Sequence, residues 1–464
     1  MALRTGLLRL MLLSTMIAAP AAAQEATEPL PGEPAAAPVE DFTLDPVVLR
    51  AADEFGFAAD RGAAAYVSPA DIERVRTGTL RDLFAGTSAV SVGGGIPMAQ
   101  KIFVNGIDML NLSVQVDGVL QNNRTFHHAS SNAFDPGLLK SVRVDPGVAA
   151  ADLGPNALAG GMIFETVDAA DILAEGQSFG GNLRTGFETN GDTLQGSATL
   201  SGRQGAFDWL IYGRRVTGDD YKTGAGDVQA GMGADLGNML VKGGLTFGEG
   251  HRVELSLQEL RDDALRPFRA NLVGIIGRPM DLRRYDTTRR NYALSYANTE
   301  AFGLWDPRAT LGFSESLVNV PDPWGSRGTS HTWSGRVENV FHLSGSDTVT
   351  AGVDAYDRLG RYEGSYALDG VTYEDFAEER SKNLGLFVQA RLEPWERWKL
   401  SFGARHDWQD FEGVNGWTDS PSGFSGNASL AYALTEALTL RAGYSDIFGG
   451  IAVEDSYIFA LLGL

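Results

Sequence analysis

Residues 398–408 read WKLSFGARHDW, and apolar side chains occupy mainly the even positions while polar residues or glycine occupy the odd ones. The same alternation recurs through the C-terminal part of the chain, for example at 252–258, 383–393 and 438–445. A period of two places one face of a strand against an apolar phase and the other face against water. These stretches are therefore predicted to be strands of an antiparallel sheet.

Both a soluble β-sandwich and a transmembrane β-barrel show this alternation. The predicted strands span about 11–14 residues, roughly twice the usual length in soluble sheets. Tryptophans lie near predicted strand ends, as in the interfacial girdles of membrane barrels; they are Trp209, Trp305, Trp333, Trp395, Trp398, Trp408 and Trp417. Since a closed barrel leaves no unpaired edge in the bilayer, residues 174–464 are predicted to form an outer-membrane barrel.

The composition excludes several classes of protein. The chain of 464 residues carries 38 Lys and Arg against 59 Asp and Glu, a formal net charge of −21. Phosphate binding needs clustered cations, so nucleic acid is not the expected partner. Cysteine is absent, which excludes disulfides and thiolate metal sites. No G-x-S-x-G, P-loop or H-E-x-x-H pattern occurs, so we predict no catalytic residues and no enzyme.

The N-terminus resembles an export signal. Residues 1–23 combine Arg4 and Arg9 with a short apolar run and end in small residues, which predicts a signal peptide cleaved near Ala23. The alternative, a membrane anchor, needs a longer apolar run. Residues 24–40 are rich in Pro, Ala and Glu and are predicted to be a disordered periplasmic tether. The predicted location is the outer membrane of a Gram-negative bacterium.

Five sequence blocks, in order, resemble the plug domain of TonB-dependent outer-membrane receptors. They are LRDLFAGTSAVSV at 80–92, IFVNGI at 102–107, VQVDGV at 114–119, LLKSVRV at 138–144 and GPNALAGGMI at 154–163. The resemblance implies a mainly β protein, with a small α+β plug at 51–173 followed by an antiparallel transmembrane β-barrel. It implies import of a scarce ligand, most simply an iron-siderophore or haem, powered by the TonB–ExbB–ExbD complex, with outer-membrane lipids around the barrel. No cofactor other than this cargo is expected.

The plug blocks also depart from the family pattern. Asn105 stands where the family usually has arginine, and 145–147 read Asp-Pro-Gly in place of Arg-Gly-Pro. In the family those arginines belong to a charged cluster that pairs the plug with the barrel wall. Asp117-Gly118 predicts a tight turn. Gly154 and Gly160-Gly161 are predicted to permit sharp turns and close packing of the plug against the wall.

Residues 41–50 resemble a TonB box, the segment that the periplasmic partner binds. Such a segment is extended and flexibly tethered, so that the partner can add it to a sheet edge. The predicted TonB-binding residues are Phe42, Thr43, Leu44, Asp45, Pro46, Val47 and Val48. The alternative is that this segment forms the first buried strand of the plug.

A second candidate site lies in the plug loop after Asp117-Gly118. Its predicted ligand-binding residues are Arg124, Phe126, His127 and His128. Adjacent histidines can bind a transition metal or haem iron, although two histidines fix no metal geometry. The alternative is a loop pair that packs or binds carboxylates. Met98 and Met109 are candidate soft ligands for copper, or simply core residues.

The number of strands is a further expectation. The family closes 22 strands around its plug, whereas about 13–14 strand signals occur here. The sequence therefore predicts an open or incomplete barrel with an unpaired edge. Alternative functions are a non-transporting or truncated barrel, or a receptor for copper, cobalamin or a glycan.

Overall fold

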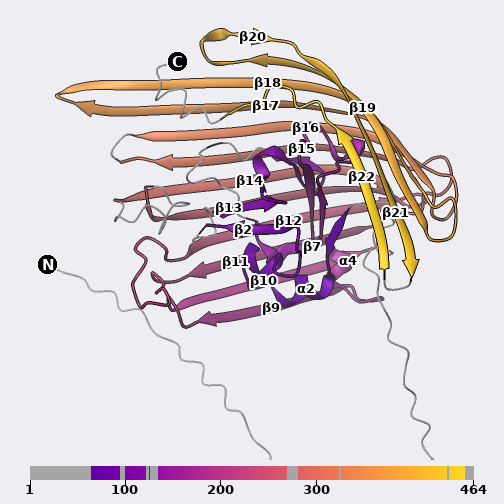
Figure 1. Ribbon diagram of the computed structural model, residues 1–464. Coiled ribbons are helices and arrows are strands. Elements are labelled where there is room, and N and C mark those ends of the chain that lie inside the picture. The colour runs from indigo at the N-terminus through magenta and orange to yellow at the C-terminus, as the bar shows by residue number, and fades with distance from the viewer. Residues whose placement is uncertain are drawn as a thin grey trace, which may run out of the picture. The chain divides into compact units, whose positions relative to one another are not determined.

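The computed structural model describes residues 64–94, 100–121, 125, 134–268, 281–322, 325–435 and 438–454. In these ranges the protein is dominated by strands, which form a small N-terminal domain and one large sheet (Figure 1). We call residues 64–173 the plug and the large sheet the wall. None of the helices in the described ranges is long and apolar enough to cross a bilayer.

The plug combines two small sheets with short helices. Its main sheet has the order β1-β7-β8-β5-β6 and the second has the order β2-β3-β4. The strands are β1 (Ala65–Val67), β2 (Val90–Gly93), β3 (Lys101–Val104), β4 (Ile107–Asp108), β5 (Ser113–Val116), β6 (Val119–Leu120), β7 (Leu139–Pro146) and β8 (Gly160–Thr166). The helices are α2 (Pro69–Arg74), α3 (Leu80–Leu83), α4 (Ala169–Ile172) and the 3₁₀ turns η3 (Met109–Asn111), η4 (Pro136–Leu138) and η5 (Ala151–Leu153). All five sequence blocks thus coincide with plug elements.

Local sequence explains where the plug helices and turns lie. The Ser68 side chain caps α2 by accepting from the Asp71 amide at 3.1 Å, and Pro69 occupies the first helical position. Asp117 and Gly118 adopt φ of 49° and 76° between β5 and β6, which confirms the predicted tight turn. Met109 is 1% exposed and packs in the plug core, as expected of a core methionine.

One expectation about glycine is wrong. A Cβ on Gly160 would lie 1.8 Å from the Asp145 carbonyl oxygen, and one on Gly161 would lie 2.5 Å from Leu153. These neighbours belong to the plug itself. The glycines therefore let β7, β8 and η5 approach one another, and they do not serve the contact between plug and wall.

The wall is a 14-stranded sheet in which nearly every strand pairs antiparallel with its neighbours along the chain. Its strands are β9 (Phe179–Glu188), β10 (Thr193–Gln204), β11 (Phe207–Thr217), β12 (Asp235–Phe247), β13 (His251–Pro267), β14 (Leu282–Asn298), β15 (Pro307–Val320), β16 (Ser326–His342), β17 (Thr348–Leu368), β18 (Val371–Leu392), β19 (Trp398–Glu412), β20 (Thr418–Asp419), β21 (Ser422–Thr435) and β22 (Leu438–Asp446). Another 3₁₀ turn, η7 (Val414–Gly416), precedes β20. Among the described strands, β9 and β22 are the two edges, as expected of an open barrel.

The predicted alternation holds along the wall. In β18, the side chains of Leu384, Leu386 and Val388 on the outward face are 44–50% exposed. Asn383 and Gln389 are buried on the inward face, which is turned toward the plug. An apolar outward face and a polar inward face are the pattern of a membrane barrel. Figure 1 shows the plug, in indigo, lying against one face of the wall.

Aromatic side chains mark where the apolar band ends. Trp333 was expected near a strand end, but it lies in the middle of β16, with its ring 4.9 Å from that of Phe313. The next outward positions are Glu315 and His331, which pair across β15 and β16. The strands therefore continue beyond the apolar band, and the aromatic girdle lies within them. The connections at this end include 218–234 and 413–421, whereas the opposite end has short turns such as 205–206 and 248–250.

Candidate functional site

Three plug aspartates form short ion pairs with cations of the wall, and a fourth, Asp117, lies 3.7 Å from Lys242. The first of the three is Asp135. It precedes η4, where its side chain also accepts from the Gly137 amide at 2.8 Å. Its carboxylate forms an ion pair with Arg214 and accepts from the Tyr212 hydroxyl and the Asn238 amide, each at 2.9 Å. Asp135 is 2% exposed, so this carboxylate is fully compensated inside the protein.

The second plug aspartate is Asp168, which begins α4. Lys242 of β12 lies 2.6 Å from it and Lys140 of β7 forms a further ion pair. Burial raises the pKa of Asp168, but the two ammonium groups outweigh this and hold the pKa well below its usual range. The same carboxylate raises the pKa of Lys140 against the opposing effect of burial. Plug and wall are therefore joined by a charged cluster at this point.

The third is Asp152 in η5. Arg391 of β18 binds both of its oxygens, at 2.7 and 2.8 Å. Gln389 accepts from the Ala151 amide at 2.8 Å, and Arg405 of β19 donates to the Ala151 carbonyl at 3.0 Å. Burial raises the pKa of Asp152, but Arg391 and Arg336 outweigh it and hold the pKa well below its usual range.

These three contacts share one arrangement of charge. The plug contributes the carboxylates and the wall contributes the cations, whereas Asp145, at one of the positions that depart from the family pattern, pairs with Arg143 inside the plug. Sequence reasoning missed these aspartates, because each also resembles an ordinary residue at the start of a helix or turn.

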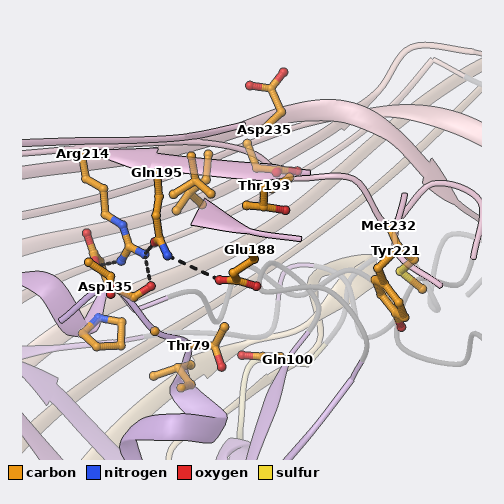
Figure 2. Close-up of a pocket in the computed structure, with 18 of the residues that line it drawn as sticks. Thr79, Gln100, Asp135, Glu188, Thr193, Gln195, Arg214, Tyr221, Met232 and Asp235 are labelled. Atoms are coloured by element: carbon orange, nitrogen blue, oxygen red, sulfur yellow. Dashed lines mark hydrogen bonds and ion pairs between the residues drawn. The ribbon is translucent and has the colours of Figure 1, made fainter. Parts of the chain in front are cut away.

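A pocket of about 270 Å³ lies between the plug and strands β9–β13, at the end with the longer connections. Five carboxylate and two arginine side chains are among its described lining residues. Figure 2 shows Gln195 between Arg214 and Glu188, joined by hydrogen bonds of 2.6 and 3.4 Å. Gln100 is 4% exposed, and its side-chain oxygen has no hydrogen-bond partner. This acidic pocket suits a ligand rich in hydrogen-bond donors better than an anion.

The sequence-predicted site residues lie outside the described residues. This holds for the seven TonB-box residues at 42–48 and for Arg124, Phe126, His127 and His128. Thr125, between two of them, is described, and its hydroxyl donates to the carbonyl of Ser316 in β15 at 3.3 Å. In the described ranges, no group of three or more His, Asp or Glu side chains could hold a metal ion.

Comparison with known proteins assigns the family. The family model for the TonB-dependent receptor-like β-barrel matches residues 118–458, and the model for the TonB-dependent receptor plug domain matches residues 60–161. The chain belongs to the TonB-dependent receptor family. Members of this family are receptors and transporters rather than enzymes, and they lie in the outer membrane of Gram-negative bacteria.

Individual relatives agree with this family. The chain is 32% identical over 404 residues to the heme transporter BhuA of Brucella ovis, covering 84% of this chain and 58% of that protein. It is 31% identical over 156 residues to TonB-dependent heme receptor A of Haemophilus ducreyi, covering 33% and 21% of the two chains. The structure superposes on the FrpB iron transporter of Neisseria meningitidis with a TM-score of 0.71 at 20% identity, covering 82% and 63% of the two chains. The chain thus spans 58% of the length of the Brucella protein.

Proposed function

We propose that the protein is an outer-membrane receptor that captures haem outside the cell and imports it by a TonB-driven movement of the plug. The observation that carries this proposal is the similarity to haem transporters over 84% of the chain. The plug bound to the wall through Asp135, Asp152 and Asp168 is the closed state of such an importer.

Import would require the plug to move relative to the wall. Ligand bound at the end with the longer connections would favour exposure of residues 42–48 to TonB, and the proton-motive force acting through ExbB–ExbD would pull on the plug. The protein performs no bond chemistry on the ligand. His127 and His128 are the proposed haem-binding residues, and one of them would bind the iron, because neutral imidazole is a common haem ligand.

Growth on haemin as the sole iron source tests this function. The full chain is expressed in a Gram-negative host without its own haem receptors, and the parent is expected to support growth only when TonB is present. Deletion of residues 42–48 is expected to abolish uptake and leave haemin binding to cells unchanged. Deletion of seven residues within the tether, 30–36, is the matched control and should leave uptake intact.

The outcomes separate the parts of the proposal. If the variant that lacks residues 42–48 took up haemin at the parental rate, TonB would bind a different segment of the protein. Growth on a ferric siderophore but not on haemin would show that the cargo is wrong while the family mechanism stands. Substitution of His127 and His128 by glutamine is expected to weaken haemin binding, and unchanged binding and haem absorption spectra would remove these residues from the site.

A further inference from the structure

A group of buried hydroxyl side chains lines the inward face of β15 and β16. We call this group the hydroxyl seam: Ser314, Ser316, Ser330, Thr332 and Ser334. The strand register places Ser316 opposite Ser330 and Ser314 opposite Thr332. None of the five is more than 7% exposed. The seam is therefore a continuous polar surface beneath the plug.

Three of these hydroxyls make no hydrogen bond. The side-chain oxygens of Ser316, Ser330 and Thr332 are buried and have no partner. Buried hydroxyls nearly always find a partner, since leaving one unpaired is unfavourable. These three side chains therefore have unused hydrogen-bonding capacity in this structure.

Basic side chains flank the seam. Arg289 of β14 lies opposite Ser316, and Arg358 of β17 lies opposite Thr332. Arg289 donates to the Gln121 side-chain oxygen at 2.5 Å and stacks on the Phe134 ring, 4.2 Å from its centroid. Guanidinium groups and hydroxyls together form a surface rich in hydrogen-bond donors. Such a surface suits a ligand with carboxylates or other oxygen acceptors.

The plug meets the seam through neutral contacts. β6 is an edge strand of the plug sheet, and its Leu120 carbonyl accepts from the Ser314 hydroxyl at 2.7 Å. The Leu120 amide donates to Ser334 at 3.3 Å. The two hydroxyls thus bind backbone groups at the edge of β6 that a neighbouring strand would otherwise bind. Water can replace such bonds readily, whereas a carboxylate of Asp135, Asp152 or Asp168 that is pulled from its cation leaves a buried charge uncompensated until water reaches it.

We propose that the hydroxyl seam lines the passage that opens when the plug moves, and that its hydroxyls bind the carboxylates of the passing ligand. The inference rests on the proposed function, because haem carries two propionates. The acidic pocket at β9–β13 would repel such a ligand, and the sectors at β11–β12 and β18 are closed by ion pairs. The seam combines replaceable plug contacts with unused hydrogen-bonding capacity.

Removing the three unpartnered hydroxyls tests the proposal. The variant is Ser316→Ala/Ser330→Ala/Thr332→Val in the full chain, and haemin is the probe. Since these hydroxyls have no partner in the closed state, the variant is expected to fold and to bind haemin at the cell surface as the parent does. Energy-dependent uptake is expected to fall about tenfold, from the loss of hydrogen bonds to charged carboxylates. The matched control is Ser197→Ala/Thr199→Val in β10, which are also buried hydroxyls of the wall.

A second measurement does not depend on the cargo. The chain has no cysteine, so Ser330→Cys introduces a single thiol. A negatively charged methanethiosulfonate reagent is expected to modify this thiol several-fold faster in cells with TonB than in cells without it. Thr199→Cys in β10 should show no such difference.

Each outcome bears on the inference. Parental uptake by the triple variant, or labelling of Ser330→Cys that is independent of TonB while haemin is imported, would overturn the passage and leave the haem proposal standing. TonB-dependent labelling in a parent that imports no haemin would support the passage and overturn the cargo. An equal loss of uptake in the β10 control would show a general effect of the substitutions and count against the seam.

Discussion

The plug meets the wall in two ways, and the contrast lies between the ion-paired sectors and the hydroxyl seam. At β11–β12 and β18, buried carboxylates of the plug bind buried cations of the wall. At β15–β16, one edge strand of the plug binds serine hydroxyls, and neighbouring hydroxyls remain unpaired. Removing one partner of a buried ion pair costs about 3–5 kcal/mol, because the other charge is left buried and unpaired, whereas a neutral hydrogen bond contributes about 0.5–1.5 kcal/mol.

The contrast shows how one interface can hold a plug in place and still open. The ion pairs fix its position, because the first step of separation leaves buried charges without partners before water reaches them. The seam can exchange its few neutral bonds with water or ligand at little cost. A pull on the plug would therefore separate the seam before the ion-paired sectors.

The largest effect is expected at Asp152. Asp152→Ala leaves Arg391, which is 2% exposed, without its bidentate partner. The expected loss is about 3–5 kcal/mol in the local stability of the plug around η5. Hydrogen–deuterium exchange of peptides from residues 148–158 measures it.

A paired substitution is the control for this prediction. Asp152→Leu/Arg391→Met removes both charges and is expected to lose much less stability than Asp152→Ala. If the single and the double variant exchange equally fast, the charge on Arg391 is not what makes this sector strong.

Acid is expected to weaken the ion-paired sectors selectively. The pKa of Asp168 is held below its ordinary value, so the folded plug favours the ionised form. This stabilisation is complete above the ordinary pKa, near 4, and is lost as pH falls from there toward the lowered value. After correction for the intrinsic exchange rate at each pH, amide exchange in residues 166–173 should therefore accelerate between about pH 4 and pH 2 in the parent.

The matching variant makes this prediction specific. Asp168→Asn is expected to weaken α4 at neutral pH and to remove most of the acceleration in acid. Asp171→Asn, in the same short helix, is the control and should retain the parental acid dependence. Equal acid sensitivity of the parent and Asp168→Asn would show that another group controls this sector.

A clash at the seam tests how closely the plug approaches it. A Cβ on Gly312 of β15 would lie 2.3 Å from a Val119 methyl group. Gly312→Ala is expected to destabilise the β5–β6 hairpin against the wall by about 1–3 kcal/mol. Exchange of residues 113–121 measures this, and Val119→Ala in the same chain should restore part of the protection, since it removes the methyl groups at 2.3 and 2.6 Å but keeps the Cβ at 2.9 Å. Gly335→Ala, where the new methyl meets only an ordinary contact at 3.9 Å, is the control.

The two kinds of contact also differ in how far the sequence revealed them. The strands, their inward and outward faces and the Asp117-Gly118 turn were predictable, because they depend on neighbouring residues. The ion pairs join residues far apart in the chain, such as Asp135 with Arg214 and Asp152 with Arg391, and no local pattern marks them. The same holds for the seam. Its serines lie on adjacent strands, and only the strand register and the position of the plug strand show that they form one surface.

The smallest effect is expected at Ser334. Its hydroxyl accepts from the Leu120 amide at 3.3 Å, a long and weak hydrogen bond. Ser334→Ala is expected to cost about 0.5–1.5 kcal/mol, seen as an acceleration of exchange at the Leu120 amide of no more than about tenfold. The rest of the plug, including residues 148–158, should exchange as in the parent. If Ser334→Ala loosened η5 as much as Asp152→Ala does, the plug would respond as one cooperative unit, and a seam that opens before the ion-paired sectors would be wrong.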